Sequence, residues 1–247
     1  MGETVFFTHV PKTAGTSMKE RVFENWIQKH DAKKASCRGY GHLLRTQPRF
    51  GLLEGHYACG VHRLVWHVEK PRYFVMLRDP VDRLVSHYHF IRTCNNPWYR
   101  HPKLDEVREH DLVSFYRAPA RQNVLTRYVA GIGWEWAGRH LSLGGWPGRK
   151  CLQRAKSNLR DRYEAFGLRE RFDVSARPFA RHLRVPVAEV SERAKETSDR
   201  PTVSELPEST VQELRELNAL DVKLYRFAVD HFEEQISETE LESPIAT

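Results

Sequence analysis

A short polar stretch near the start of the chain, PKTAGTS, has residue types suited to binding an anion. It follows the apolar run VFFTHV and precedes an amphipathic segment, so backbone amides and a helix dipole should converge at one point. The glycine lets the backbone approach an anion closely, the hydroxyls add donors, and the lysine adds a compact positive charge. The alternative is an ordinary polar turn with a capping serine. The predicted anion-binding residues are Pro11, Lys12, Thr13, Ala14, Gly15, Thr16 and Ser17.

A second basic position follows another apolar run, YFVML. Arg78 comes directly after that run, and Ser86 lies about two helical turns beyond Asp79, on the face that starts at the head of the helix. A guanidinium fork and a hydroxyl can hold one phosphate group together. Asp79 and Pro80 fit the N-cap and the first helical position, with Asp82 as the partner in a capping box. The alternative is a capping motif with a salt bridge.

His56 lies between these two segments, at the end of a plausible strand, Phe50–Tyr57. An imidazole is neutral near pH 7 and can take a proton from a hydroxyl, so His56 is the predicted general base. The alternative is a strand-end histidine bonded to a backbone carbonyl. His9 and Glu54 are weaker candidates, because we expect His9 to point into the sheet and Glu54 to pair with an arginine.

Apolar runs alternating with amphipathic segments must position these side chains. This alternation predicts an α/β fold with a mainly parallel sheet and helices on its faces. We expect one domain over residues 1–247, in which residues 93–147 form an insertion of loops and short helices that could cover a site. Residues 236–247 are predicted to be a disordered acidic tail. The main predicted strands are Thr4–Val10, Tyr73–Leu77 and Tyr163–Leu168, and the later predicted helices are Arg149–Arg162, Phe172–Leu183 and Glu208–Gln235.

Composition narrows the range of functions. The net charge is +7, and residues 154–184 hold nine Lys or Arg against four Asp or Glu, which suits an anionic ligand or a solvated helix face. The aromatic-interleaved basic repeats of a nucleic-acid-binding protein are missing. The four cysteines form no C-x-x-C pair, and His87-x-His89 has the wrong offset for one helix face, so we expect no metal. No apolar run approaches the roughly 18 residues that a membrane span needs, and we expect no secretory signal.

The order of these motifs resembles a known family. PKTAGTS after an apolar strand, then GHY, then LRDPVDRLVSHY is similar to the sulfotransferase family 2 domain, a group that includes the heparan sulfate 2-O-sulfotransferases and related carbohydrate sulfotransferases. QNVLTRYVAG, FGLRERFD and LNALDVKLYRFA resemble later segments of the same domain. The resemblance covers roughly Val5 to Phe232.

This resemblance implies a P-loop-NTPase-like three-layer fold and the donor 3′-phosphoadenosine 5′-phosphosulfate (PAPS), with PAP as product and no metal. Pro11–Ser17 would bind the 5′-phosphosulfate, and Arg78 with Ser86 would bind the 3′-phosphate. Two catalytic residues follow: Lys12 beside the bridging oxygen and His56 as the base. Residues 93–147 would lie near the acceptor site.

The resemblance leaves the acceptor open. A carbohydrate hydroxyl is the leading expectation, followed by a small-molecule alcohol or phenol and by a peptide tyrosine. A P-loop-type nucleotide kinase is a rival, but it would need a Gly-Lys-Ser/Thr ending and an acidic metal ligand where Arg78 follows YFVML. A non-catalytic anion-binding module is a further alternative. We expect a cytoplasmic, bacterial-type enzyme, or a Golgi lumenal domain if a membrane anchor was trimmed away.

The sequence also suggests roles for five further residues. Asn123 and Arg127 are expected near the nucleotide or the acceptor, and Arg200 in the SDRP loop could add to the nucleotide end. The pair Asn218 and Asp221 is predicted to be structural, at the junction before the last helix.

Overall fold

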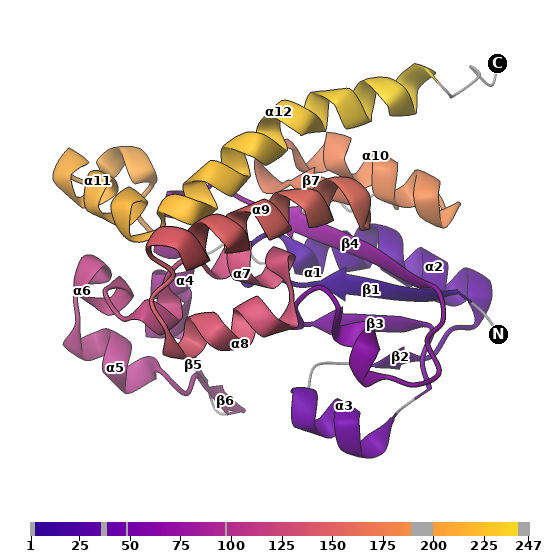
Figure 1. Cartoon of the computed structure of the whole chain (residues 1–247), viewed down its shortest axis with the longest axis horizontal. Coiled ribbons are helices and arrows are strands. Elements are labelled where there is room, and N and C mark those ends of the chain that lie inside the picture. Colours follow the sequence, from indigo (N-terminus) through magenta and orange to yellow (C-terminus); the bar gives the residue numbers. More distant parts are fainter. Residues whose placement is uncertain (1–2, 36–38, 48, 97, 189–199, 242–247) are drawn as a thin grey trace.

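A five-stranded sheet forms the centre of the computed structural model (Figure 1), which describes residues 3–35, 39–47, 49–96, 98–188 and 200–241. Every neighbouring pair of strands is parallel. In spatial order the strands are β2 (Lys34–Ala35), β3 (Leu52–Gly55), β1 (Thr4–Thr8), β4 (Pro71–Leu77) and β7 (Tyr163–Leu168). The predicted α/β fold is confirmed, and β1 with its loop and helix follows the P-loop arrangement.

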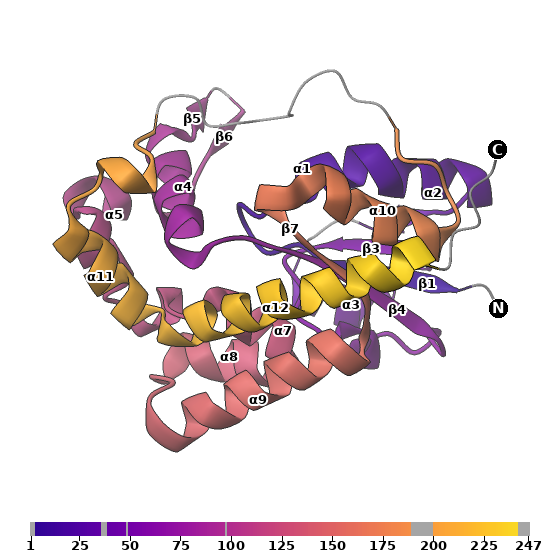
Figure 2. The same cartoon turned by 90° about the horizontal axis from the view of Figure 1, so that it is seen from above.

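Helices cover both faces of the sheet and give three layers (Figure 2). Alternate strand residues serve the two faces: Phe7 and Phe74 pack on one side, and Phe6 and Val75 on the other. The first face is covered by α1 (Gly15–Met18), α2 (Glu24–His30) and α10 (Phe172–Leu183). The second face is covered by α7 (Val124–Ala130), α9 (Gly145–Asp161) and α12 (Ala219–Leu241).

The helix that follows the first loop is not uniform. A π-helical turn, η1 (Lys19–Phe23), joins α1 to α2. Met18, Val22, Phe23 and Trp26 are all buried, as their helical spacing predicts. The π-turn adds a residue within the helix and could not be inferred from that spacing.

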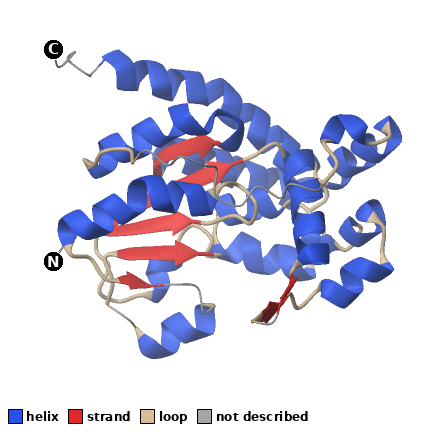
Figure 3. Ribbon diagram, turned by 180° about the vertical axis from the view of Figure 1, so that it is seen from behind, coloured by secondary structure: helices blue, strands red, loops and turns tan. Residues whose placement is uncertain are grey.

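A separate helical cluster lies beyond the carboxyl ends of the strands (Figure 2). Its apolar residues come from α4 (Pro80–Thr93), α5 (Leu104–Glu109), α6 (Leu112–Tyr116) and α11 (Glu208–Leu217). Figure 3 shows the ribbon of β5 (Asn95–Asn96) and β6 (Tyr99–Arg100) apart from the main sheet. The remaining elements are α3 (Tyr40–Thr46), α8 (Ile132–His140) and the 3₁₀ turns η2 (Val61–Leu64), η3 (Pro119–Arg121), η4 (Arg169–Arg171) and η5 (Val203–Glu205).

The single long helix predicted over 208–235 was wrong, because it divides at Asn218 into α11 and α12. The Asn218 side chain donates to the carbonyl of Leu214 at 3.1 Å and accepts from the amide of Asn123 at 2.9 Å, so it competes with the helix backbone. The predicted start of a disordered tail at residue 236 was also wrong, since α12 continues to Leu241. Residues 242–247 lie outside the described part of the chain.

Other element boundaries shifted by a few residues. β1 ends at Thr8 and β3 spans only Leu52–Gly55, so both strands are shorter than predicted. β4 extends two residues further towards its start than predicted, whereas β7 and α10 have the predicted bounds.

Candidate active site

Four strand ends meet at one edge of the sheet. Because β3, β1, β4 and β7 are parallel neighbours, their carboxyl ends lie side by side. His56 follows β3, the loop of residues 11–14 follows β1, Arg78 follows β4, and Arg169 follows β7. This order places a histidine on one side of the loop and arginines on the other.

The loop of residues 11–14 has a backbone shape suited to an anion. Lys12 and Ala14 have φ values of 67° and 64°, in the left-handed region, whereas Thr13 between them has a negative φ. Such alternation turns successive amides towards one side and forms a concavity for anions. Left-handed non-glycine residues cost about 1–3 kcal/mol each, so the loop shape is held against its local preference. The helix that begins at Gly15 adds amides that lack an intrahelical acceptor.

Thr13 and Gly15 serve this loop differently from the prediction. The Thr13 hydroxyl is buried and donates to the carbonyl of Val10 at 2.9 Å, so its predicted role as a donor to the anion was wrong. Gly15 is needed because a Cβ there would lie 2.3 Å from Cδ2 of His9. The reason for the glycine is therefore packing within the protein. Pro11, Ala14, Thr16 and Ser17 are all half-buried along the loop and the helix start.

His9 connects the loop with the neighbouring strand end. Its ring packs against Gly15, with its centroid 5.2 Å from that of His56, so the expectation that it points into the sheet was wrong. Burial, followed by repulsion from His56 and Lys19, lowers the pKa of His9 to about 3. This imidazole is therefore neutral and acts as a spacer between the loop and His56.

His56 is the exposed histidine at this edge. Its Nδ1 lies 2.7 Å from the carbonyl oxygen of His9, and a carbonyl can only accept, so Nδ1 carries the proton. In neutral His56 the lone pair is then on Nε2, as a general base requires. The carbonyl bond is the one that the structural alternative predicted, and it also fixes the tautomer that a general base would need. Glu54 pairs with Lys34 at 2.8 Å, so its expected pairing with an arginine was wrong.

Lys12 projects from the loop towards α4. Its Nζ lies 4.6 Å from the ring centroid of Phe90, and its backbone carbonyl accepts from Nη1 of Arg78 at 2.9 Å. Burial, and then three nearby guanidinium groups of which Arg78 is the strongest, lower the pKa of Lys12 to about 8. The ammonium therefore lies in a region where an additional anion would be stabilised.

Three arginines converge on one carboxylate beside the loop. Arg78 is buried and donates through Nε and Nη2 to Oδ2 of Asp82, at 2.8 and 2.6 Å. Arg200 reaches Oδ1 of Asp82 at 2.8 Å, and Nη1 of Arg169 lies 3.8 Å from Oδ2. We call Arg78, Arg169 and Arg200 the arginine cluster. Sequence reasoning missed Arg169, although it follows its strand directly, as Arg78 does.

Both Arg78 and Asp82 have partners within the protein. The Arg78 fork, expected to face a phosphate, is largely occupied by Asp82 and by the Lys12 carbonyl. Asp79 caps α4 as predicted, accepting from the amide of Asp82 at 2.9 Å. The capping box does not form, because the Asp82 carboxylate faces the arginines and the amide of Asp79 donates to Glu170.

Ser86 is buried on α4, one helical turn beyond Asp82. Residues four apart share a helix face, so Ser86 is on the face that carries Asp82. This position is compatible with the predicted role of Ser86 beside Arg78.

Asn123 and Arg127 have structural roles, because their side chains bond to backbone groups of the protein. Both are buried. Oδ1 of Asn123 accepts from the amide of Leu220 at 2.9 Å, and Arg127 donates to the carbonyls of Ala120 and Gly138. These bonds join α7 to its neighbours.

The predicted structural role of Asp221 and Asn218 is confirmed. Asp221 accepts from the amides of Leu125 and Thr126 at 3.1 and 2.7 Å, and its carboxylate lies 3.6 Å from the Arg83 guanidinium. Together with the bond from Asn123 to Asn218, these contacts attach the start of α12 to α7.

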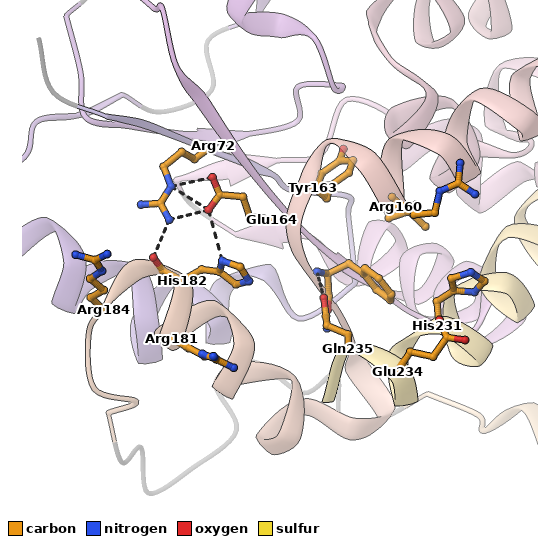
Figure 4. Close-up of a pocket in the computed structure, with 12 residues that line it drawn as sticks. Arg72, Arg160, Tyr163, Glu164, Arg181, His182, Arg184, His231, Glu234 and Gln235 are labelled. Atoms are coloured by element: carbon orange, nitrogen blue, oxygen red, sulfur yellow. Dashed lines mark hydrogen bonds and ion pairs between the residues drawn. The ribbon is translucent and has the colours of Figure 1, made fainter. Parts of the chain in front are cut away.

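A hollow of about 710 Å³ lies at the opposite edge of the sheet (Figure 4). It is lined by Arg72 and Glu164, near the starts of β4 and β7, and by the ends of α10 and α12. Arg72 donates to both oxygens of Glu164 at 2.9 Å and to the carbonyl of His182 at 2.7 Å. The residues that line this hollow include none from the loop, from His56 or from the arginine cluster.

Two kinds of site are absent from the described residues. They contain no group of three or more His, Cys, Asp or Glu side chains that could hold a metal ion. Over the same ranges, no helix is long and apolar enough to span a bilayer.

Comparison with known proteins identifies the family. The uronyl 2-sulfotransferase homolog pip of Drosophila melanogaster is 28% identical over 109 residues, which cover 38% of this chain and 20% of that protein. The chain thus spans about a fifth of that relative's length. A crystal structure of a sulfotransferase from Alicyclobacillus acidocaldarius aligns over 93% of this chain and 96% of its own, with 15% identity and a TM-score of 0.44. The sequence model of the sulfotransferase family matches residues 2–128, just over half of the chain, and this protein therefore belongs to the sulfotransferase family.

Proposed function

We propose that this protein moves a sulfuryl group from PAPS to an acceptor hydroxyl. The observation that carries the proposal is the row of strand ends, in which the loop of residues 11–14 lies between an exposed histidine and the arginine cluster. A donor with a phosphosulfate at one end and a phosphate at the other suits two anion sites along one sheet edge. Membership of the sulfotransferase family supports sulfuryl transfer.

In this proposal the two anion sites divide the donor between them. The loop amides and Lys12 bind the 5′-phosphosulfate, where the helix start also favours negative charge. The arginine cluster, with Ser86, binds the 3′-phosphate. Arg78 uses three of its five N–H groups on Asp82 and Lys12, so two N–H groups are left for a phosphate.

The transfer step follows from the arrangement of the side chains. Nε2 of His56 accepts the proton of the acceptor hydroxyl while the hydroxyl oxygen forms its bond to sulfur. The bond between sulfur and the bridging oxygen breaks, and its electron pair leaves with the nucleotide phosphate. Lys12 and the loop amides stabilise the charge that grows on that oxygen. The products are the sulfate ester and PAP.

The residue types disfavour the rival kinase. A kinase of the P-loop type needs a carboxylate that holds a metal ion at the triphosphate. The first residue after β4 is Arg78, and the next, Asp79, uses its carboxylate to cap α4. Asp82 faces arginines. The carboxylates at this strand end are thus engaged in roles that do not serve a metal–triphosphate.

For the acceptor we propose a carbohydrate hydroxyl. The relative from Drosophila is named as a uronyl 2-sulfotransferase homolog. A chain of ring contacts also leads away from the site. Nζ of Lys12 lies 4.6 Å from the ring centroid of Phe90. The centroids of Phe90 and His101 are 6.2 Å apart, and those of His101 and Tyr99 are 6.4 Å apart. Tyr99 and Trp98 are 50% and 94% exposed. Such rings offer large amphipathic surfaces to a sugar.

Thermal unfolding with nucleotides tests the donor. A ligand that binds only the folded state raises the melting temperature in proportion to its affinity and concentration. We expect PAP to raise it more than ATP with magnesium at equal concentration. An equal or smaller shift with PAP would contradict the PAPS proposal.

A transfer assay with labelled sulfate tests the acceptor. The panel contains uronic-acid glycans, neutral glycans, phenols and tyrosine peptides, each offered with labelled PAPS. We expect label in a glycan. Label in phenols or peptides alone would support the alternative acceptors and contradict the carbohydrate assignment.

A further inference from the structure

The carboxylate of Asp82 occupies the centre of the arginine cluster. Its Oδ2 accepts two bonds from Arg78, at 2.6 and 2.8 Å, and its Oδ1 is 2.8 Å from Nη1 of Arg200. Arg169 lies further off, at 3.8 Å. The side chain of Asp82 is 19% exposed, so these ion pairs are partly shielded from solvent. Such charge-assisted bonds are stronger than neutral ones.

The neighbouring acidic residues Asp79 and Glu170 have other partners. Asp79 accepts from the amide of Asp82, and Glu170 accepts from the amide of Asp79 and, at 2.7 Å, from the hydroxyl of Tyr225. Burial alone would raise the pKa of Asp82, but Arg78 and Arg200 outweigh it and hold this pKa below its ordinary value. Asp82 is therefore an anion across the neutral pH range.

A phosphate that reaches this cluster meets a carboxylate already bound to the same guanidinium groups. It must share Arg78 and Arg200 with Asp82 or take their bonds from it. Like charges brought together in a partly buried site repel strongly. Asp82 therefore opposes the binding of the anion that the arginines attract.

We propose that Asp82 is a built-in counter-anion, which holds the arginines in place when no nucleotide is bound and weakens the grip on the 3′-phosphate so that PAP can leave. This inference rests on the proposed function. It differs from a purely structural salt bridge because it predicts that removing the carboxylate tightens nucleotide binding, and does so only for nucleotides that carry a 3′-phosphate.

The test is Asp82→Asn, which removes the charge and keeps the shape. Calorimetry would compare PAP with adenosine 5′-phosphate, which has no 3′-phosphate. We expect Asp82→Asn to bind PAP at least about tenfold more tightly than the wild type, because the repulsion between the carboxylate and the 3′-phosphate is relieved. Affinity for adenosine 5′-phosphate should change less than about twofold, because the arginine cluster does not touch that ligand.

Two further variants complete the design. Asp82→Ser removes the same charge and serves if the asparagine variant does not fold. Asp161→Asn is the matched control, since its carboxylate also pairs with an arginine, Arg160, at 2.9 Å but lies next to the start of β7, at the opposite edge of the sheet. PAP affinity should be unchanged in this control.

The outcomes separate the two proposals. Weaker or unchanged PAP binding in both Asp82 variants would overturn the counter-anion role. Equal tightening of PAP and adenosine 5′-phosphate would also overturn it, since the effect would then be one of general charge. A wild type that binds PAP no more tightly than adenosine 5′-phosphate would contradict the PAPS proposal itself.

Discussion

The loop after β1 and the arginine cluster beside it both favour anions, yet different parts of the chain build them. The loop uses main-chain amides, two left-handed residues and a glycine fitted against His9. The cluster uses side chains from three separate segments that meet at Asp82. A site made from backbone should tolerate no added atoms, whereas a site made from guanidinium groups should respond mainly to charge.

His56 lies on the far side of the loop from the arginine cluster. The strand order β3-β1-β4-β7 separates the proposed proton acceptor from the proposed 3′-phosphate site. Substitutions on the His56 side should therefore affect turnover, and those on the cluster side should affect nucleotide affinity.

The largest effect is expected for His56→Ala. Losing a general base typically slows a reaction by about 10²–10⁴-fold, so kcat should fall by that range while the Kd for PAP changes less than about twofold. Single-turnover assays with labelled PAPS and calorimetry with PAP would measure the two quantities. His30→Ala, at an exposed histidine that ends α2, is the control and should keep full turnover.

A His56→Ala enzyme with wild-type turnover would exclude His56 as the base. Loss of PAP binding in the same variant would show that this side of the loop also binds the nucleotide. Turnover and nucleotide affinity would then not be separated between the two sides of the loop.

A smaller loss is expected for Gly15→Ala, which tests the backbone-built site. The new Cβ would approach Cδ2 of His9 to 2.3 Å, and crowding of this kind costs about 1–3 kcal/mol of stability. PAP affinity should fall too, because the helix start must shift. The double variant Gly15→Ala with His9→Ala removes the ring that the new Cβ would meet, so it should recover part of the stability and part of the PAP affinity. Denaturant unfolding and calorimetry give the two values.

Gly133→Ala is the control for Gly15→Ala. Gly133 is helical, and a Cβ there would meet no atom within 4 Å, so this variant should be neutral or slightly stabilised. Equal behaviour of the two glycine variants would show that His9 does not constrain the loop.

Local patterns explain what could be predicted from the sequence. The bounds of β7 and α10 and the Asp79 cap with Pro80 follow from residue spacing and capping chemistry over a few positions. The positions of the loop and of His56 at the edge of the sheet could be predicted because each follows an apolar strand. In parallel sheets those positions share one edge.

Contacts between distant segments explain what could not be predicted. Arg200 reaches Asp82 from another part of the chain, and nothing near either residue signals that bond. Asn123 looked like a ligand-binding residue but serves the backbone of Leu220. Gly15 was predicted to let the backbone approach an anion, but the neighbour that requires a glycine is His9.

The smallest effect is expected from pH, and it tests whether Lys12 belongs to the loop site. Burial and the nearby guanidinium groups lower its pKa to about 8, so free protein loses this charge as pH rises through about 8. A bound anion favours the charged form, and PAP affinity should therefore decline above pH 8, by at most about tenfold per unit for one proton. Calorimetry with PAP from pH 6.5 to 9.5 would measure the decline, and Lys12→Arg should abolish it.

The stability of the free protein should change in the opposite sense over the same interval. The folded state disfavours the Lys12 proton relative to the unfolded chain, whose lysines titrate near 10.5. Between pH 8 and 10.5 the unfolded state therefore binds more protons, and the contribution of Lys12 to the free energy of unfolding rises with pH. Falling PAP affinity alongside this rise, both absent in Lys12→Arg, would distinguish titration of Lys12 from general alkaline unfolding. The same decline in Lys12→Arg would assign it to another group and remove Lys12 from the loop site.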